Sequence, residues 1–171
     1  MEARRPFQVR PATRDDVDAF RAHRGALFGE ALLLAPGPEA ERLDAATRVA
    51  FRSAVELGTC LAWLALAREH AHEPVAVGSC ALHLVERLPS PRNASPVEGY
   101  LTHLYVVPAW RRAGVGAELV RAALDAARAR DLGRVRLHAT EPGRALYERL
   151  GFRVRTNEME RGVGPGDAES P

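Results

Sequence analysis

The chain has 171 residues, of which 46% are hydrophobic and 27% are charged, and its formal net charge at pH 7 is +2. A chain of this length and composition can bury a core without disulfides or structural metal, as one folded domain does. Its 24 basic residues, all arginine, nearly balance 22 acidic ones, and the most apolar run, Cys60 to Ala67, is far shorter than a bilayer-spanning segment. We therefore expect no nucleic-acid partner and no membrane span.

The N-terminal half is predicted to contain a strand, two helices and a hairpin. In chain order, we expect a strand at 7–10, helices at about 13–29 and 39–57, and antiparallel strands at 60–67 and 75–85. The first helix has the clearest start, because Thr13 and Asp16 have the spacing of a capping box. Cys60 and Cys80 stand alone on the hairpin, which favours buried free thiols over a zinc site or a disulfide.

The C-terminal half alternates between strands and helices. We expect strands at 98–107, 135–139 and 152–159, a long helix after Gly116, a short helix at 142–150, and a disordered tail at 162–171. This order predicts an α/β fold in which a mixed central sheet carries helices on both faces. The domain is expected to span residues 1–161. Nothing at the N-terminus resembles an export signal, so we expect a cytoplasmic protein.

The stretch from Leu104 to Ala117, LYVVPAWRRAGVGA, carries the most chemical information. It leads from a strand through a turn to the start of a helix, where backbone N–H groups without helical partners can bind a pyrophosphate. Gly114 and Gly116 suit such a turn, because a β-carbon would block the ligand or forbid a positive φ. Two glycines that merely relieve crowding are the alternative. The third glycine of a dinucleotide fingerprint and the Gly-Lys-Ser/Thr of a P-loop are both missing.

Together with its strand and proline, this stretch resembles motif A of the GNAT superfamily of acyl-CoA-dependent N-acetyltransferases. Arg111, Gly114 and Gly116 fill the family's Arg/Gln-x-x-Gly-x-Gly/Ala pattern, and the stretch from Ala139 to Phe152 resembles its motif B, which ends in Leu-Tyr-x-x-x-Gly-Phe. The resemblance implies a GNAT-like fold in which two parallel strands splay apart and admit the pantetheine arm of acetyl-CoA. It also implies no metal.

The activity implied is transfer of the acetyl group of acetyl-CoA directly to a primary amine of a small molecule or peptide. Acetyl-CoA and the amine would bind together, and the oxyanion would be held by a backbone N–H near Val106. Neither motif contains a cysteine, which argues against an acetyl-cysteine intermediate. A non-catalytic acyl-CoA-binding or regulatory module is the alternative, and plain nucleotide binding is a third.

The resemblance also implies which residues contact acetyl-CoA. Pantetheine would pair with the main chain of Leu104, Tyr105 and Val106. The turn around the pyrophosphate would consist of Arg111, Arg112, Ala113, Gly114, Val115, Gly116 and Ala117, with the two arginines adding mobile charge at its rim. Thr140 stands where the family often has a cofactor-binding asparagine, and its hydroxyl can still form one hydrogen bond.

Tyr147 occupies the place of the family's general acid, which protonates the departing CoA thiolate; a packing role is the alternative. For the base, Glu98 is the first candidate, His103 the second and His138 the third, with a solvated strand end or a satisfied core histidine as the alternatives. Strict alternation along the strand would place Glu98 with Tyr100 and Thr102, and His103 on the opposite face. A bulge, which the family often carries in this strand, would change those faces.

The acceptor amine is expected to bind between two loops, at 25–38 and 86–97. These loops carry leucines together with Glu30 and Glu86, which suit a partly apolar, cationic amine. A homodimer is also expected, because the last strand lacks the further strand that usually follows it in the family and a partner would cover the open sheet edge.

Overall fold

The computed structural model describes residues 6–31, 33–68, 73–91 and 93–155. The chain divides into two compact units, Met1–Ala139 and Thr140–Pro171. The first unit contains a five-stranded sheet in the order β1-β2-β3-β4-β5. Its elements are β1 (Phe7–Pro11), α1 (Val17–Glu30), α2 (Pro38–Glu56), β2 (Cys60–Ala67), β3 (Val75–Glu86), β4 (Val97–Val106), α3 (Val115–Ala129) and β5 (Val135–Arg136).

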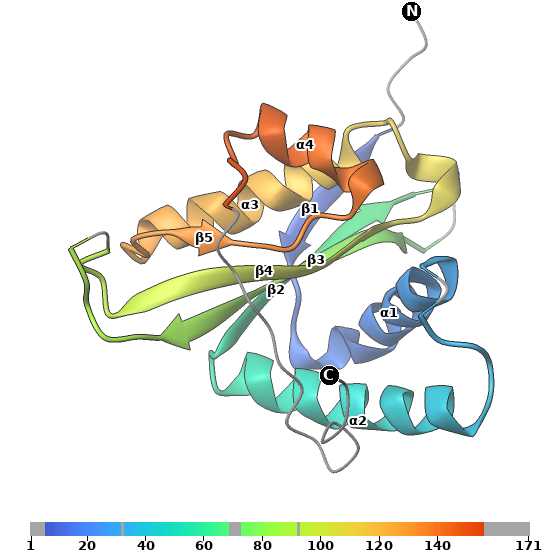
Figure 1. Ribbon diagram of the computed structural model, residues 1–171. Helices are drawn as coiled ribbons and strands as arrows, with labels where there is room; N and C mark the ends of the chain where they lie inside the picture. Colours follow the sequence, from blue (N-terminus) through green and yellow to red (C-terminus); the bar gives the residue numbers. More distant parts are fainter. Residues whose placement is uncertain (1–5, 32, 69–72, 92, 156–171) are drawn as a thin grey trace, which may run out of the picture. The chain divides into compact units, whose positions relative to one another are not determined.

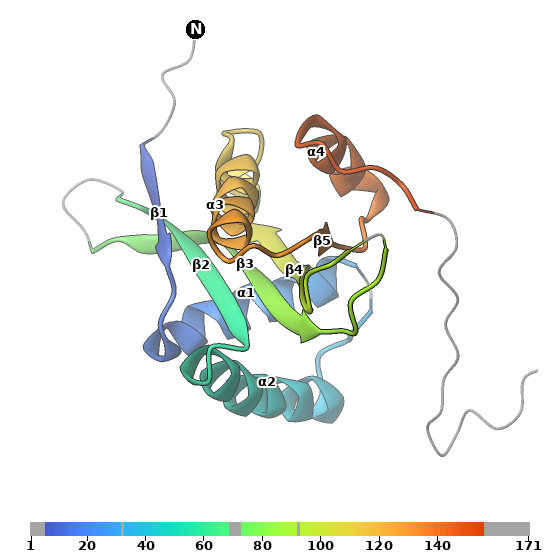
Figure 2. The ribbon, with the colours of Figure 1, turned by 90° about the vertical axis from the view of Figure 1, so that its left-hand side faces the viewer.

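The sheet of the first unit is mixed, as predicted. Strands β1 to β4 are antiparallel neighbours, and β5 runs parallel to β4. Helices α1 and α2 cover one face of this sheet and α3 covers the other (Figures 1 and 2). None of the helices in the described ranges is long and apolar enough to cross a membrane.

The capping box before α1 is confirmed. The Thr13 side chain accepts a hydrogen bond from the Asp15 N–H, and the Asp16 carboxylate accepts one from the Thr13 N–H at 2.7 Å. Asp16 also pairs with Arg10 at 2.7 Å, which ties the start of the helix to β1.

Strand β4 contains a bulge at His103. Tyr105 lies opposite Ser79 on β3 and Thr102 lies opposite Ala81, so β4 has one extra residue between these pairs. His103 adopts a φ of 55°, in the left-handed region. Since directly opposed residues point to the same face, Thr102 and Tyr105 share the face that α1 and α2 cover. His103 lies there too, with its ring 6.0 Å from that of Phe20 on α1. Strict alternation is therefore wrong at this point, and the bulge that the family resemblance offered as the alternative is present.

Strands β4 and β5 separate soon after they meet. Their parallel pairing consists of Gly99 with Val135 and Tyr100 with Arg136, after which β4 continues to Val106 while β5 ends. This is the splayed pair that the sequence predicts. The predicted strand at 135–139 is correspondingly too long, because the chain leaves the sheet after Arg136.

The second unit contains a 3-10 turn at Glu141–Gly143 followed by α4 (Arg144–Arg149). The predicted strand at 152–159 is wrong over residues 152–155, which are irregular, and its remainder lies outside the described residues. Phe152 packs edge-on against Tyr147, with ring centroids 5.7 Å apart, and Val154 is 59% exposed. The apolar alternation thus reflects local packing rather than sheet pairing. The expected tail at 162–171 also lies outside the described residues, and the domain boundary stays a prediction.

Candidate active site

The turn after β4 has the geometry of an anion-binding helix start. A 3-10 turn at Pro108–Trp110 leads to Gly114, whose φ of 91° forms the N-terminal cap of α3. A side chain at Gly114 would be strained, as the sequence predicts. Gly116 lies inside the first turn of α3, so a positive φ does not explain the glycine there, and close approach of a ligand and relief of crowding remain as explanations. Because the first N–H groups of a helix have no intrahelical acceptor, this turn fits a pyrophosphate.

Arg111 is held in place rather than mobile. Its Nε donates to the Val106 carbonyl at 3.0 Å, and its Nη2 lies 2.5 Å from a Glu30 carboxylate oxygen at the end of α1. The other Glu30 oxygen accepts a hydrogen bond from the Tyr105 hydroxyl at 2.8 Å. Hydrogen bonds from Tyr105 and Arg111 lower the pKa of Glu30. Glu30 thus neutralises Arg111, whereas the side chain of Arg112 is exposed at the rim.

The β4 main chain at Leu104, Tyr105 and Val106 lies beyond the last pair with β5. A strand edge that has parted from its neighbour can pair with an extended ligand. The first unit therefore offers a strand edge that fits a pantetheine arm, followed by a helix start that fits its diphosphate.

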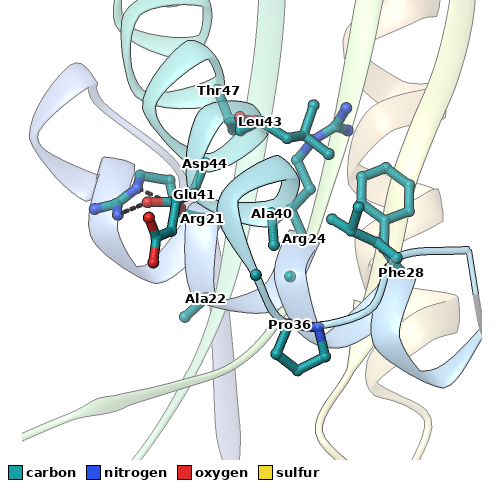
Figure 3. Close-up of a pocket in the computed structure, with 13 residues that line it drawn as sticks. Arg21, Ala22, Arg24, Phe28, Pro36, Ala40, Glu41, Leu43, Asp44 and Thr47 are labelled. Atoms are coloured by element: carbon teal, nitrogen blue, oxygen red, sulfur yellow. Dashed lines mark hydrogen bonds and ion pairs between the residues drawn. The ribbon is translucent and has the colours of Figure 1, made fainter.

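Two cavities lie on the face of the sheet that α1 and α2 cover. The outer one, of about 440 Å³, lies between α1, α2 and the loop that joins them (Figure 3). The inner one, of about 220 Å³, reaches the sheet, where His83 and His103 line it. Arg24 and Thr47 line both. The expected acceptor loop at 25–38 thus borders a cavity, whereas the loop at 86–97 and Glu30 line neither.

Glu98, the first candidate base, is surrounded by arginines. Its side chain is 1% exposed and pairs with Arg87, with Arg134 at 2.6 Å and with Arg136 at 2.7 Å. Burial raises the pKa of Glu98. The hydrogen bonds and positive charges of these arginines lower it by more than burial raises it, so the pKa of Glu98 is below its ordinary value. A carboxylate held in this way is a weak proton acceptor, which does not favour Glu98 as the base.

His103, the second candidate, is also weakly basic. Arg24 Nη1 lies 2.7 Å from its Nδ1 and 2.5 Å from its Nε2. Burial, with the nearby charges of Arg24 and His83, lowers the pKa of His103 to about 3. Because a guanidinium only donates hydrogen bonds, the ring accepts from Arg24 and is poorly placed to take a further proton.

His138, the third candidate, lies just after β5, where the two parallel strands have parted. Its Nδ1 is hydrogen-bonded to the Tyr100 hydroxyl of β4, and the imidazole is exposed. The structure thus brings together a histidine and a tyrosine beside the splay. Sequence reasoning missed this pair, although the parallel strands carry the two residues at nearly adjacent register positions.

A sequence model of the acetyltransferase (GNAT) family matches residues 27–152. The chain belongs to this family. GNAT proteins are acyltransferases that use acetyl-CoA, so the helix start and the strand edge described above have a cognate ligand. No curated protein sequence matches the chain.

Solved structures agree with this assignment. A GCN5-related N-acetyltransferase from Ralstonia eutropha JMP134 is 27% identical, with a TM-score of 0.78 over 92% of this chain and 99% of that one. A predicted acetyltransferase from Clostridium acetobutylicum, with acetyl-CoA, is 19% identical, with a TM-score of 0.78 over 92% and 97% of the two chains. Glucosamine-6-phosphate N-acetyltransferase from Arabidopsis thaliana is 15% identical, with a TM-score of 0.67 over 93% and 99%. At the lower identities, the likeness shows the GNAT fold.

The second unit brings the motif B residues of the GNAT family close together. A β-carbon built on Gly143 would lie 3.2 Å from Thr140 Oγ1 and 3.3 Å from the Tyr147 ring. The tyrosine ring also packs against Phe152. Glycine at position 143 thus leaves room for Thr140 and Tyr147 to lie side by side at the start of α4.

The two cysteines are buried and free, as predicted. Cys60 lines the inner cavity, where burial raises the pKa of its thiol to about 11. Burial also raises the pKa of Cys80. Since the thiolate is the nucleophile, a thiol with so high a pKa is a poor acetyl acceptor at neutral pH.

Proposed function

We propose that this GNAT protein transfers the acetyl group of acetyl-CoA directly to a primary amine of a small molecule. One observation carries the proposal: strand β4 borders the inner cavity and leads directly into the turn that fits a pyrophosphate. Its bulge residue His103 lines the inner cavity, and its C-terminal end leads into the pyrophosphate-binding turn. The outer cavity, of about 440 Å³, lies within the size range of small-molecule sites, which favours a small acceptor over a protein.

In this reaction the amine nitrogen attacks the thioester carbonyl carbon. A C–N bond forms, the C–S bond breaks, and CoA leaves as a thiolate. The attacking nitrogen gives up one proton to a base, and the thiolate receives one from an acid, for which Tyr147 is our candidate. An ordinary alkylamine is protonated at neutral pH, and removing that proton costs about 4.6 kcal/mol at pH 7. The base therefore has a substantial effect on rate.

We assign the base to His138. Glu98 is held by guanidinium groups and His103 accepts from Arg24, whereas His138 is exposed beside the splay with Tyr100 as its partner. Histidine is the side chain that most often serves as a general base near neutral pH. We further propose that the N–H groups from Arg112 to Ala117 bind the pyrophosphate, and that Thr140 donates to the cofactor.

Two measurements test the function. Calorimetric titration with acetyl-CoA, CoA and NAD should show binding of the first two only. Thiol release from acetyl-CoA over a panel of primary amines should then identify an acceptor. Binding without thiol release by any amine would favour the non-catalytic module. Binding of NAD instead of CoA would favour the nucleotide-binding alternative.

Two variants test the assigned acid and base. We expect His138→Gln to lower kcat about 100-fold and Tyr147→Phe to lower it about 10-fold, because a thiolate leaves readily without help. Acetyl-CoA affinity should stay within twofold in both. A kcat for His138→Gln equal to that of the unmutated enzyme would refute the assignment of the base.

The homodimer and the cytoplasmic location stay predictions. Gel filtration tests the homodimer.

A further inference from the structure

Arg24 is the charged side chain that connects the two cavities. It projects from the middle of α1 and lines both spaces, between Phe28 and Leu43 on the outer side and His103 at the sheet. Its guanidinium carbon lies 4.5 Å from the centre of the Phe28 ring. Figure 3 shows it on the far side of the outer cavity from the Arg21–Asp44 pair. A ligand that filled both cavities would pass this guanidinium.

The charge of Arg24 has no counterion among the residues that the structure describes. Arg21, three residues earlier, pairs with Asp18 and Asp44, whereas no described carboxylate hydrogen-bonds or pairs with Arg24. Its Nε is buried and forms no hydrogen bond with any described residue. Burial lowers the pKa of Arg24, so the fold bears the cost of desolvating this cation.

The walls of the inner cavity carry no anion that would compensate this charge. Its two histidines lie beside Arg24, and burial is the main cause that lowers the pKa of His83 and of His103, so both are neutral at pH 7. The rest of the lining is apolar apart from Thr47, with Phe20 and Phe51 stacked at 4.4 Å. An anion of the ligand would satisfy what the protein leaves open here.

We propose that Arg24 binds a carboxylate of the acceptor, so that the substrate is an amine of the amino-acid class. The inference rests on the proposed acetyl transfer and narrows its acceptor. One guanidinium between neutral histidines balances the single charge of a carboxylate. A phosphate carries close to two negative charges at neutral pH and would remain partly uncompensated. The sequence-based expectation of a partly apolar, cationic amine included no negative group, and this proposal adds a carboxylate to it.

Matched acceptors test the proposal. We would measure kcat/KM for the common amino acids, each as the free acid, as the primary amide, and as the aminophosphonate. The enzyme should prefer the best acid over its amide roughly 10- to 100-fold, the range expected for a charge-assisted hydrogen bond, and mainly through KM. Arg24→Gln should abolish this preference, and Arg24→Lys should keep part of it. Arg48→Gln, an exposed arginine on α2 that pairs with Asp18, is the control and should keep it whole.

A second readout separates this proposal from the activity. Titration with N-acetyl amino acids, as acids and as amides, measures product binding without catalysis. Acids that bind more tightly than amides, with a preference that Arg24→Gln removes, support the carboxylate site even if no acceptor releases thiol. Equal binding of acid and amide, or a preference that survives in Arg24→Gln, overturns it. Preference for the phosphonate overturns the assignment to a carboxylate.

Discussion

Two buried or half-buried charges near opposite ends of strand β4 differ in whether the protein supplies a counterion. At the first end, Glu98 is 1% exposed, lines neither of the two cavities, and is paired with three arginines of the same fold. Toward the other end, at the bulge, Arg24 of α1 is half-buried and lies beside two cavities, and among the described residues its only hydrogen-bond partner is the neutral His103. A charge that the fold itself compensates serves the structure. A charge that the fold leaves uncompensated beside a cavity is available to a ligand.

The largest effect should follow from removing Glu98. In Glu98→Gln three guanidinium groups lose their shared carboxylate, and we expect the free energy of unfolding to fall by about 3 kcal/mol, the low end for a broken buried pair because the arginines are partly exposed. Urea unfolding measures this, and kcat of the folded fraction should hardly change. The exposed Asp125, paired with Arg128, is the control, since Asp125→Asn should cost less than about 0.5 kcal/mol. Lost turnover with unchanged stability would instead make Glu98 the base.

The opposite sign is expected at Arg24. Arg24→Met replaces an uncompensated charge with an apolar side chain of similar length, and we expect the free energy of unfolding without ligand to rise by about 1 kcal/mol. The lost contacts with Phe28 and His103 limit the gain. Thermal unfolding of the two proteins side by side tests it. A loss of 2 kcal/mol or more, on the order of a broken hydrogen-bonded charge, would place Arg24 with Glu98 as a structural group.

The sequence predicted the first four strands and the shape of the turn before α3 well, because these features depend on local patterns. The capping box at Thr13, the strand that Pro108 ends and the glycine at 114 each follow from the conformation of a few neighbouring residues. The residues that act on the acceptor cannot be predicted from local patterns in this way. Whether Glu98 is a base or an ion-pair centre depends on Arg134 and Arg136, which lie far along the chain.

The bulge and Arg24 show the same limit. One extra residue at His103 brings its ring to the face of Thr102, which strict alternation cannot predict. Arg24 occupies a place in the otherwise apolar stripe of α1 formed by Val17, Phe20 and Leu27. That polar interruption was the available signal, but only the tertiary structure shows that no carboxylate within the described ranges pairs with it.

The pH dependence of stability sharpens the comparison further. The pKa of His103 is about 3 in the folded protein against 6.5 for an ordinary histidine, so between these values the unfolded chain binds a proton that the folded protein does not. The stabilisation that comes from keeping His103 neutral is therefore complete above pH 6.5 and declines as the pH falls. We expect it to reduce the free energy of unfolding by about 1 kcal/mol between pH 6 and pH 5. Burial also lowers the pKa of His23 and of His83, which adds in the same direction.

The variant His103→Asn isolates the contribution of His103 to the pH dependence of stability, because it keeps a polar side chain beside Arg24 without a titrating group. Urea unfolding at pH 6 and pH 5 should show a shallower pH dependence in the variant than in the unmutated protein. Equal slopes would mean that His103 is already protonated in the fold. Arg24 would then face a second cation, and a carboxylate ligand would have two positive partners instead of one.

The smallest effect should come from Arg87, the outermost partner of Glu98. Its side chain is 47% exposed, and in Arg87→Ala the carboxylate still pairs with Arg134 and Arg136. We expect the free energy of unfolding to fall by less than about 1 kcal/mol, because an exposed guanidinium recovers its hydration when the pair is lost. Urea unfolding in low and high salt measures it, and the difference between the two proteins should shrink in high salt. A loss as large as that of Glu98→Gln would mean that Glu98 needs all three arginines at once. The arrangement of the three guanidinium groups, rather than the number of positive charges, would then stabilise the carboxylate at this end of β4.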